Sequence, residues 1–186
     1  MKDKVNKAKE VVLNGGVILY PTDTIWGIGC SAIMESAIKK IFRIKRRDNN
    51  KLLISLVSSI EMLERYVKNI PEFVLKYLYD ESPTTIIYPK VMGLSQILYG
   101  KNESIAIRLV KDNFCKALID QINAPLISTS ANISGNPFPK KFKEIDRKII
   151  NGVDYVISFD GCDLKNSKPS RVIKVLLNGQ IKIIRE

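Results

Sequence analysis

Helix-like and strand-like hydrophobic patterns alternate along almost the whole chain, and this order narrows the choice of fold more than any other property. Helices, marked by apolar residues three or four apart, are predicted at 5–12, 36–45, 60–70, 73–78, 114–122 and 142–150. Strands are predicted at 16–20, 52–57, 84–88, 104–109, 125–129, 153–159, 171–177 and 181–185. Such an order predicts an α/β fold, in which helices flank a twisted mixed sheet. No repeat or break in composition divides residues 1–186, so we expect a single domain.

The composition is that of a globular protein, since 45% of the 186 residues are hydrophobic and 26% are charged. The longest apolar runs are only a few residues long, which excludes a transmembrane helix, and residues 1–10 lack the apolar core of a signal peptide. We therefore expect a cytoplasmic protein with no membrane partner. Its net charge of +11 should attract polyanions such as nucleic acid or nucleotides, although a solvated lysine-rich surface explains the charge equally well.

The sequence has no histidine, which excludes Ser-His, Cys-His and His-zinc chemistry within the chain. Its three cysteines, Cys30, Cys115 and Cys162, lie far apart and predict neither a metal site nor a disulfide framework. We expect each of them to be a buried or neutral thiol rather than a nucleophile, since free cysteine is commonly buried.

Four segments place hydroxyls, amides and cations beside predicted strand ends, where ligands of α/β proteins tend to bind. They are YPTDTIWGIG at 20–29, KRR at 45–47, SIAIR at 104–108 and STSANISGNP at 128–137. In an extended chain the hydroxyls of Thr22 and Thr24 share a face, while Gly27 and Gly29 permit a close backbone approach or a positive φ. An ordinary turn, in which Asp23 binds its own backbone, is an equal alternative.

Each of the other three segments also allows two interpretations, one structural and one functional. Lys45 and Arg47 end a predicted helix, where cations complement the helix dipole, but three cations in a row can also clamp a phosphate chain. Because a polar loop, 48–51, follows, we expect both side chains to be exposed. Alternation puts Arg108 on the face of Ser104, so it points to solvent or into a cleft. The 128–137 run is a candidate anion-binding or amino-acid-binding loop, or a Ser/Asn-rich turn.

The four segments, in this order and at this spacing, resemble the YrdC-like family of L-threonylcarbamoyladenylate synthases. The resemblance extends from about Lys7 to Arg185 and is to the short, single-domain bacterial form. It implies an α/β fold around a concave basic site. The implied reaction joins L-threonine, bicarbonate or CO2 and ATP into threonylcarbamoyl-AMP with release of pyrophosphate, for threonylcarbamoyladenosine modification of tRNA. The implied partners are the tRNA-modification proteins that accept the adenylate, with weak binding of RNA or tRNA itself.

The resemblance also carries roles to matching positions. It implies contacts with threonine at Thr24, Arg108, Ser130 and Ser170. It implies contacts with ATP at Lys45, Arg47, Ser104, Asn132 and Arg185. The K-x-R pair, Lys45 and Arg47, would be the catalytic cations that face the phosphates. Mg²⁺ is expected to arrive with ATP and to be held by phosphate oxygens and water, without metal ligands from the protein.

The sequence departs from the family pattern at Asp48, which stands in place of a proline, and at Lys51 and Leu56, which replace ligands found in longer members. We therefore carry no ligand role to Lys51 or Leu56. Two alternatives to the synthase remain. A non-catalytic RNA-binding module would use the basic surface, and a carbamoyl-adenylate enzyme would resemble the hydrogenase maturation proteins that embed a similar domain.

Overall fold

The computed structural model describes residues 1–48, 52–100, 103–157 and 168–186. Its α-helices are α1 (Lys2–Leu13), α2 (Glu35–Lys45), α3 (Ile60–Glu64), α4 (Glu72–Tyr79), α5 (Asn113–Ile122) and α6 (Arg147–Gly152). Its strands are β1 (Ile18–Pro21), β2 (Trp26–Gly29), β3 (Ile54–Val57), β4 (Thr84–Tyr88), β5 (Ile105–Leu109), β6 (Leu126–Ser130), β7 (Tyr155–Val156), β8 (Arg171–Val175) and β9 (Ile181–Arg185). These elements confirm the predicted α/β class.

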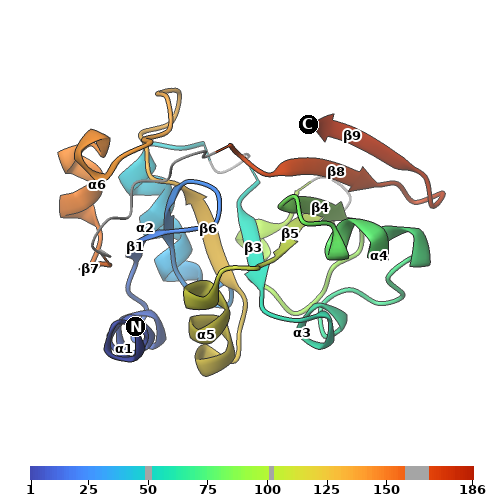
Figure 1. Ribbon diagram of the computed structural model, residues 1–186, viewed down its shortest axis with the longest axis horizontal. Coiled ribbons are helices and arrows are strands. Elements are labelled where there is room, and N and C mark those ends of the chain that lie inside the picture. Colours follow the sequence, from blue (N-terminus) through green and yellow to red (C-terminus); the bar gives the residue numbers. More distant parts are fainter. Residues whose placement is uncertain (49–51, 101–102, 158–167) are drawn as a thin grey trace.

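The described strands form one mixed sheet in the order β7-β1-β2-β6-β3-β5-β4-β8-β9. Three neighbouring pairs, β1 with β7, β3 with β5 and β4 with β8, are parallel, and the others are antiparallel. Strand β6 joins the two halves, because its first residues pair with β3 and its last residues pair with β2. Figure 1 shows α1, α3 and α5 along one side of the strands, with β8 and β9 at the end of the sheet away from α1.

Local sequence signals explain where several helices begin and end. Asn14 caps α1, and Gly15 follows with a φ of 78°, a conformation that glycine adopts without strain. Helices α3 and α5 begin at N-caps, where the side chains of Ser59 and Asp112 accept the backbone N–H of Met62 and Cys115. Among the described residues, no helix is long and apolar enough to cross a bilayer.

Four predictions differ from the structure. Residues 26–29 form β2, where no strand was predicted, and the helix predicted at 60–70 ends at Glu64. The helix predicted at 142–150 is divided into a short 3-10 turn, Phe142–Glu144, and α6, because Asp146 starts a new helix by accepting the N–H of Lys148. The strand predicted at 153–159 contains only Tyr155–Val156, and residues 158–159 lie outside the described part of the chain.

The glycines of β2 serve a close backbone approach. A Cβ at Gly29 would collide with the carbonyl oxygen of Ile127, and a Cβ at Gly27 would lie 3.2 Å from the hydroxyl of Ser128. Neither glycine has a positive φ, so only the first of the two predicted uses of these glycines is confirmed. The close packing of β2 on β6 brings the polar end of β6 beside the turn that precedes β2.

Candidate active site

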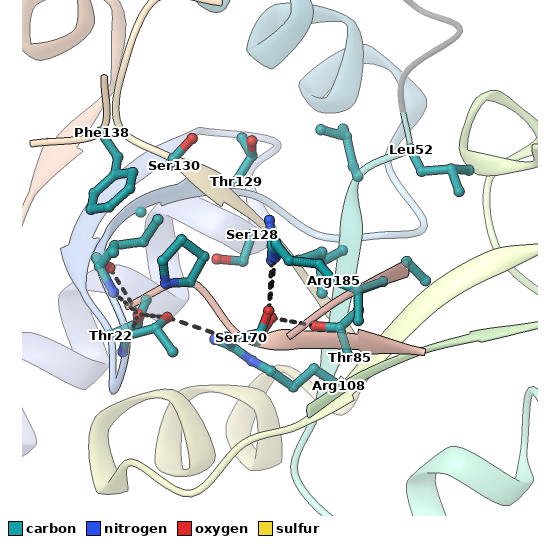
Figure 2. Close-up of a pocket in the computed structure, with 18 of the residues that line it drawn as sticks. Thr22, Leu52, Thr85, Arg108, Ser128, Thr129, Ser130, Phe138, Ser170 and Arg185 are labelled. Atoms are coloured by element: carbon teal, nitrogen blue, oxygen red, sulfur yellow. Dashed lines mark hydrogen bonds between the residues drawn. The ribbon is translucent and has the colours of Figure 1, made fainter. Parts of the chain in front are cut away.

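A pocket of about 370 Å³ lies over the middle of the sheet, where the polar ends of several strands meet. Its walls come from the turn between β1 and β2, from strands β3, β4, β5 and β6, and from the segments around Asn136, Ser170 and Arg185. Figure 2 shows Ser128, Thr129 and Ser130 along one wall, Phe138 and Leu52 towards opposite ends, and Arg108, Ser170, Thr85 and Arg185 grouped on the opposite wall. Residues far apart in sequence thus enclose one small volume.

Arg108 lies at the base of the pocket and is only 4% exposed. The alternation in β5 directs it to the pocket side of the sheet, as the sequence predicted for a cleft. Its Nη2 donates to Asp23 Oδ1 at 3.1 Å, and its Nη1 donates to Thr24 Oγ1 at 3.2 Å. Asp23 therefore pairs with Arg108 and does not bind its own backbone. This contact holds the guanidinium in place and offsets its charge.

The hydroxyls of Thr22 and Thr24 form a hydrogen-bonded chain that runs from Thr24 through Thr22 to the carbonyl of Ile25. Thr22 Oγ1 donates to the carbonyl of Ile25 at 2.8 Å, so its hydrogen is used there. The 2.9 Å contact between the two hydroxyls is then a donation from Thr24 to Thr22. With its hydrogen given to Thr22 and one lone pair facing Arg108, Thr24 offers a ligand an acceptor. It suits the ammonium or hydroxyl group of an amino acid.

Ser170 and Arg185 close the pocket next to Arg108. The hydroxyls of Ser170 and Thr85 lie 2.8 Å apart, and Arg185 donates to the carbonyl of Ser170 through Nε at 3.1 Å and Nη2 at 2.7 Å. These contacts, drawn in Figure 2, tie β9 to the segment before β8. Burial, with a further contribution from the charge of Arg108, lowers the pKa of Arg185. The charge of Arg108 therefore still acts on Arg185, although Asp23 pairs with Arg108.

The three residues of the KRR segment end up in different places, because Arg46 takes a left-handed conformation with a φ of 48°. The N–H of Arg47 reaches back to the carbonyl of Phe42 at 2.9 Å, which closes the helix end in a Schellman-type turn. Arg46 is exposed, Arg47 lines the pocket, and Lys45 points into the interior. Arg47 is held by donation from its Nη2 to the carbonyl of Leu52 at 3.0 Å, and burial lowers its pKa.

The expectation that Lys45 is exposed was wrong, since only 1% of this residue is accessible. Lys45 continues the buried stripe of α2 one turn beyond Ile41, so its aliphatic stem packs as a core residue. Its Nζ donates to the carbonyls of Ser130 and Asn132 and to Asn132 Oδ1. Burial, and to a smaller extent the charge of Arg47, lowers its pKa to about 7. Lys45 is absent from the described lining of the pocket.

The structure brings together most of the residues that the sequence assigned to the site. Seven of the nine line the pocket, namely Thr24, Arg47, Arg108, Ser130, Asn132, Ser170 and Arg185. Lys45 and Ser104 do not; Ser104 is buried just before β5, and its carbonyl accepts the N–H of Gly100. The roles of all nine residues stay predictions.

Other lining residues were not predicted. Thr85 and Ile87 reach the pocket from alternate positions of β4, a pattern that the sequence shows but does not connect with the site. Phe138 adds an aromatic wall from beyond the Ser/Asn-rich run. Leu56, one of the departures from the family pattern, is fully buried in β3, and Lys51 lies outside the described residues.

The charged side chains of the described pocket lining are all cationic. Three arginines line the pocket, and among its described lining residues there is no Asp, Glu, His or Cys. Cys30 and Cys115 are buried elsewhere with raised thiol pKa values, chiefly because of burial, which agrees with the expected neutral thiols; Cys162 is outside the described residues. Such a lining can orient and neutralise anions, but it offers no nucleophile of the cysteine or carboxylate type.

The chain is similar to several known proteins over most of its length. A protein of Methanocaldococcus jannaschii is 37% identical over 170 residues, covering 90% of this chain and 78% of the relative. The threonylcarbamoyl-AMP synthase of Marinobacter nauticus is 30% identical over 178 residues, covering 94% of this chain and 93% of the relative. The crystal structure of Pyrococcus abyssi Sua5 complexed with L-threonine superposes with a TM-score of 0.88 at 28% identity. That match covers the whole of this chain but only 54% of the longer Sua5 chain.

A family model gives the same result over most of the sequence. The model of the Sua5, YciO and YrdC proteins, described as "Telomere recombination", matches residues 10–186. This match includes all nine residues assigned to the site and every strand of the sheet. The fold, the site and the relatives together show that the chain belongs to the Sua5/YciO/YrdC family.

Proposed function

We propose that this protein is a threonylcarbamoyl-AMP synthase. The observation that supports it most strongly is the pocket lined by three arginines and several hydroxyls, without a carboxylate among its described lining residues. Such a site suits two anionic substrates, an amino-acid carboxylate and a nucleoside triphosphate. The relative from Marinobacter nauticus carries this name, and the Pyrococcus abyssi structure contains L-threonine.

In the proposed reaction, the amine of L-threonine attacks CO2 to form a carbamate and gives up a proton. A carbamate oxygen then attacks the α-phosphorus of ATP, and the bond from that phosphorus to the bridging oxygen breaks, releasing pyrophosphate. If bicarbonate is the carbon source, one water is also released. The products are threonylcarbamoyl-AMP and pyrophosphate, and no covalent intermediate with the protein is needed.

The protein's task in this scheme is to orient substrates and neutralise charge, which is most of catalysis in phosphoryl transfer. Arg108 would bind the threonine carboxylate, with Thr24 accepting from the ammonium or the hydroxyl group. Ser130 and Ser170 would complete this end. Arg47 and Arg185 would offset charge on the triphosphate and on the leaving pyrophosphate.

The magnesium ion would enter as part of the ATP substrate. The described lining residues include no Asp, Glu, His or Cys, and the described residues contain no cluster of three or more such residues that could hold a metal. Phosphate oxygens and water can supply the oxygen ligands that Mg²⁺ prefers. This donor set fits a metal carried by the nucleotide.

We further propose that a second protein transfers the threonylcarbamoyl group to tRNA, which is the step that must consume this adenylate. Such a role fits a cytoplasmic location. The net charge of +11 favours weak, salt-dependent contact with RNA as well. The RNA-binding module without catalysis remains the alternative that the assay below must exclude.

The test is to incubate the purified protein with Mg-ATP, L-threonine and labelled bicarbonate, and to measure pyrophosphate and labelled adenylate. We expect pyrophosphate release to require threonine and bicarbonate together. Omission of each substrate in turn is the control. Equal pyrophosphate release without threonine, or salt-dependent RNA binding without any turnover, would contradict the proposal.

A further inference from the structure

We propose that Lys45 is a positioning residue, which acts by holding the loop of residues 130–136 (the 130–136 loop) and not by touching the triphosphate. This inference rests on the proposed function, because the loop matters for catalysis only if it holds a substrate. It replaces the phosphate contact that the K-x-R pattern implied for Lys45. Arg47 keeps its place in the pocket wall.

The first argument is the direction of the lysine's donors. In its charged form, which it holds below its pKa of about 7, Lys45 has three N–H donors, and its Nζ lies within hydrogen-bond distance of three oxygens of the 130–136 loop. Two of these are the carbonyls of Ser130 and Asn132, and the third is Asn132 Oδ1 at 3.2 Å. No donor remains for a phosphate while these contacts last. With 1% of the residue accessible and Lys45 absent from the described lining, a phosphate also lacks a path to it.

The second argument is the effect of Lys45 on the Asn132 amide. Because an ammonium only donates, it fixes the amide with its oxygen towards Lys45. Ser130 Oγ donates to the same oxygen at 2.5 Å, and Asn132 Nδ2 donates to the carbonyl of Asn136 at 2.5 Å. Since Asn132 lines the pocket, we assign the second N–H of its Nδ2 to a substrate oxygen. Lys45 thus orients the Asn132 amide so that its Nδ2, and not its Oδ1, faces a substrate.

The third argument is that Lys45 also binds the far part of the loop. Its own carbonyl accepts the N–H of Ser134 at 2.9 Å, so its side chain holds the start of the loop while its backbone holds the middle. The backbone contact survives substitution of the side chain. A variant at position 45 therefore releases the first residues of the loop without detaching the loop from α2.

The decisive experiment is a double-mutant cycle on kcat/KM for ATP, measured as pyrophosphate release at saturating threonine and bicarbonate. The variants are Lys45→Met, Asn132→Ala and the double variant. We expect each single change to lower kcat/KM roughly tenfold or more, the size of a lost hydrogen bond to a charged group. The double variant should lose at least threefold less than the product of the two single losses. If the loss in the double variant comes within threefold of the product of the two single losses, the two residues act independently and the proposal is overturned.

Lys39→Met is the matched control, since it makes the same chemical change on α2 at an exposed side chain paired with Glu35. It should leave kcat/KM unchanged. If Lys45→Met fails to melt cooperatively, Lys45→Gln replaces it in the cycle, because an amide keeps two N–H donors and buries no charge.

A second measurement separates this inference from the proposed function. Hydrogen exchange of the backbone amides at 130–136 should be faster in Lys45→Met than in the wild-type protein, and unchanged in Lys39→Met. This test needs no turnover, so a wild-type protein that makes no pyrophosphate would refute the synthase while the exchange still tests Lys45. Unchanged exchange in the 130–136 loop overturns the positioning role.

Discussion

Replacing Arg108 by alanine should lower the free energy of unfolding and raise the KM for threonine, and the two effects can be measured separately. Arg108 is 4% exposed, and Asp23, its partner at 3.1 Å, has 14% of its side chain accessible. Removing one member of a buried ion pair costs about 3–5 kcal/mol, because the other charge is left unpaired. Since Asp23 keeps some contact with solvent, we expect a loss near 3 kcal/mol. A domain with a total stability of roughly 5–15 kcal/mol should remain folded.

The functional loss follows from the proposed carboxylate contact. Charge-assisted hydrogen bonds are worth about 1.5–3 kcal/mol, which corresponds to a rise of about 10- to 150-fold in the KM for threonine. The double variant Asp23→Asn with Arg108→Met removes both charges together, so it should recover most of the stability while threonine use stays impaired. Arg171→Met is the matched control, since its pair with Asp80 at 3.1 Å is partly exposed and should contribute at most about 1 kcal/mol.

The measurements are urea unfolding and the KM for threonine on the same four proteins. The reasoning about burial is wrong if Arg108→Ala unfolds at the same urea concentration as Arg171→Met. The assignment of the carboxylate is wrong if the double variant, folded and active, has a threonine KM within twofold of the wild-type value.

Three further predictions concern other parts of the molecule. Gly29→Ala should lower the free energy of unfolding by about 1–3 kcal/mol, measured by urea unfolding, because the new Cβ would press on the carbonyl of Ile127. Burial lowers the pKa of Lys45 from its ordinary value of 10.5 to about 7. Between these two pH values Lys45 binds more protons in the unfolded chain than in the folded one. Its contribution to the free energy of unfolding therefore rises with pH over this range. Urea unfolding at pH 7 and pH 9 should show that rise in the wild-type protein, and a smaller one in Lys45→Met. Arg185→Ala should raise the KM for ATP roughly tenfold, whereas Lys182→Ala on the same strand should not, and equal effects would remove Arg185 from the site.

Much of the fold follows from local patterns. The β-branched run at 84–88 and the alternation at 104–109 predicted β4 and β5 closely, and that alternation also put Arg108 on the side of the cleft. Strand β2 was missed because Gly27 and Gly29 have a low preference for strands. Their place is decided by how closely β2 packs on β6, which is a long-range property.

The site was predictable in composition but not in its internal contacts. The motifs selected nine residues, of which seven line the pocket, yet the pairing of Asp23 with Arg108, 85 positions later, depends on the arrangement of the sheet. Lys45 shows the opposite case, since its place one turn after Ile41 in the buried stripe of α2 was visible in the sequence. Its charge suggested exposure, and only the three acceptors of the 130–136 loop make burial acceptable.

The strand order has a consequence for how the protein gains its activity during folding. The pocket draws on residues from Thr22 to Arg185, and strands that are distant in the chain, such as β6 and β3, must pair before its walls exist. Contacts of this kind form slowly, and a partly folded intermediate would present no complete binding site. Substrates therefore cannot guide the early steps of folding. They bind the finished molecule, shift the equilibrium towards it by mass action, and so should slow its digestion by proteases in proportion to occupancy.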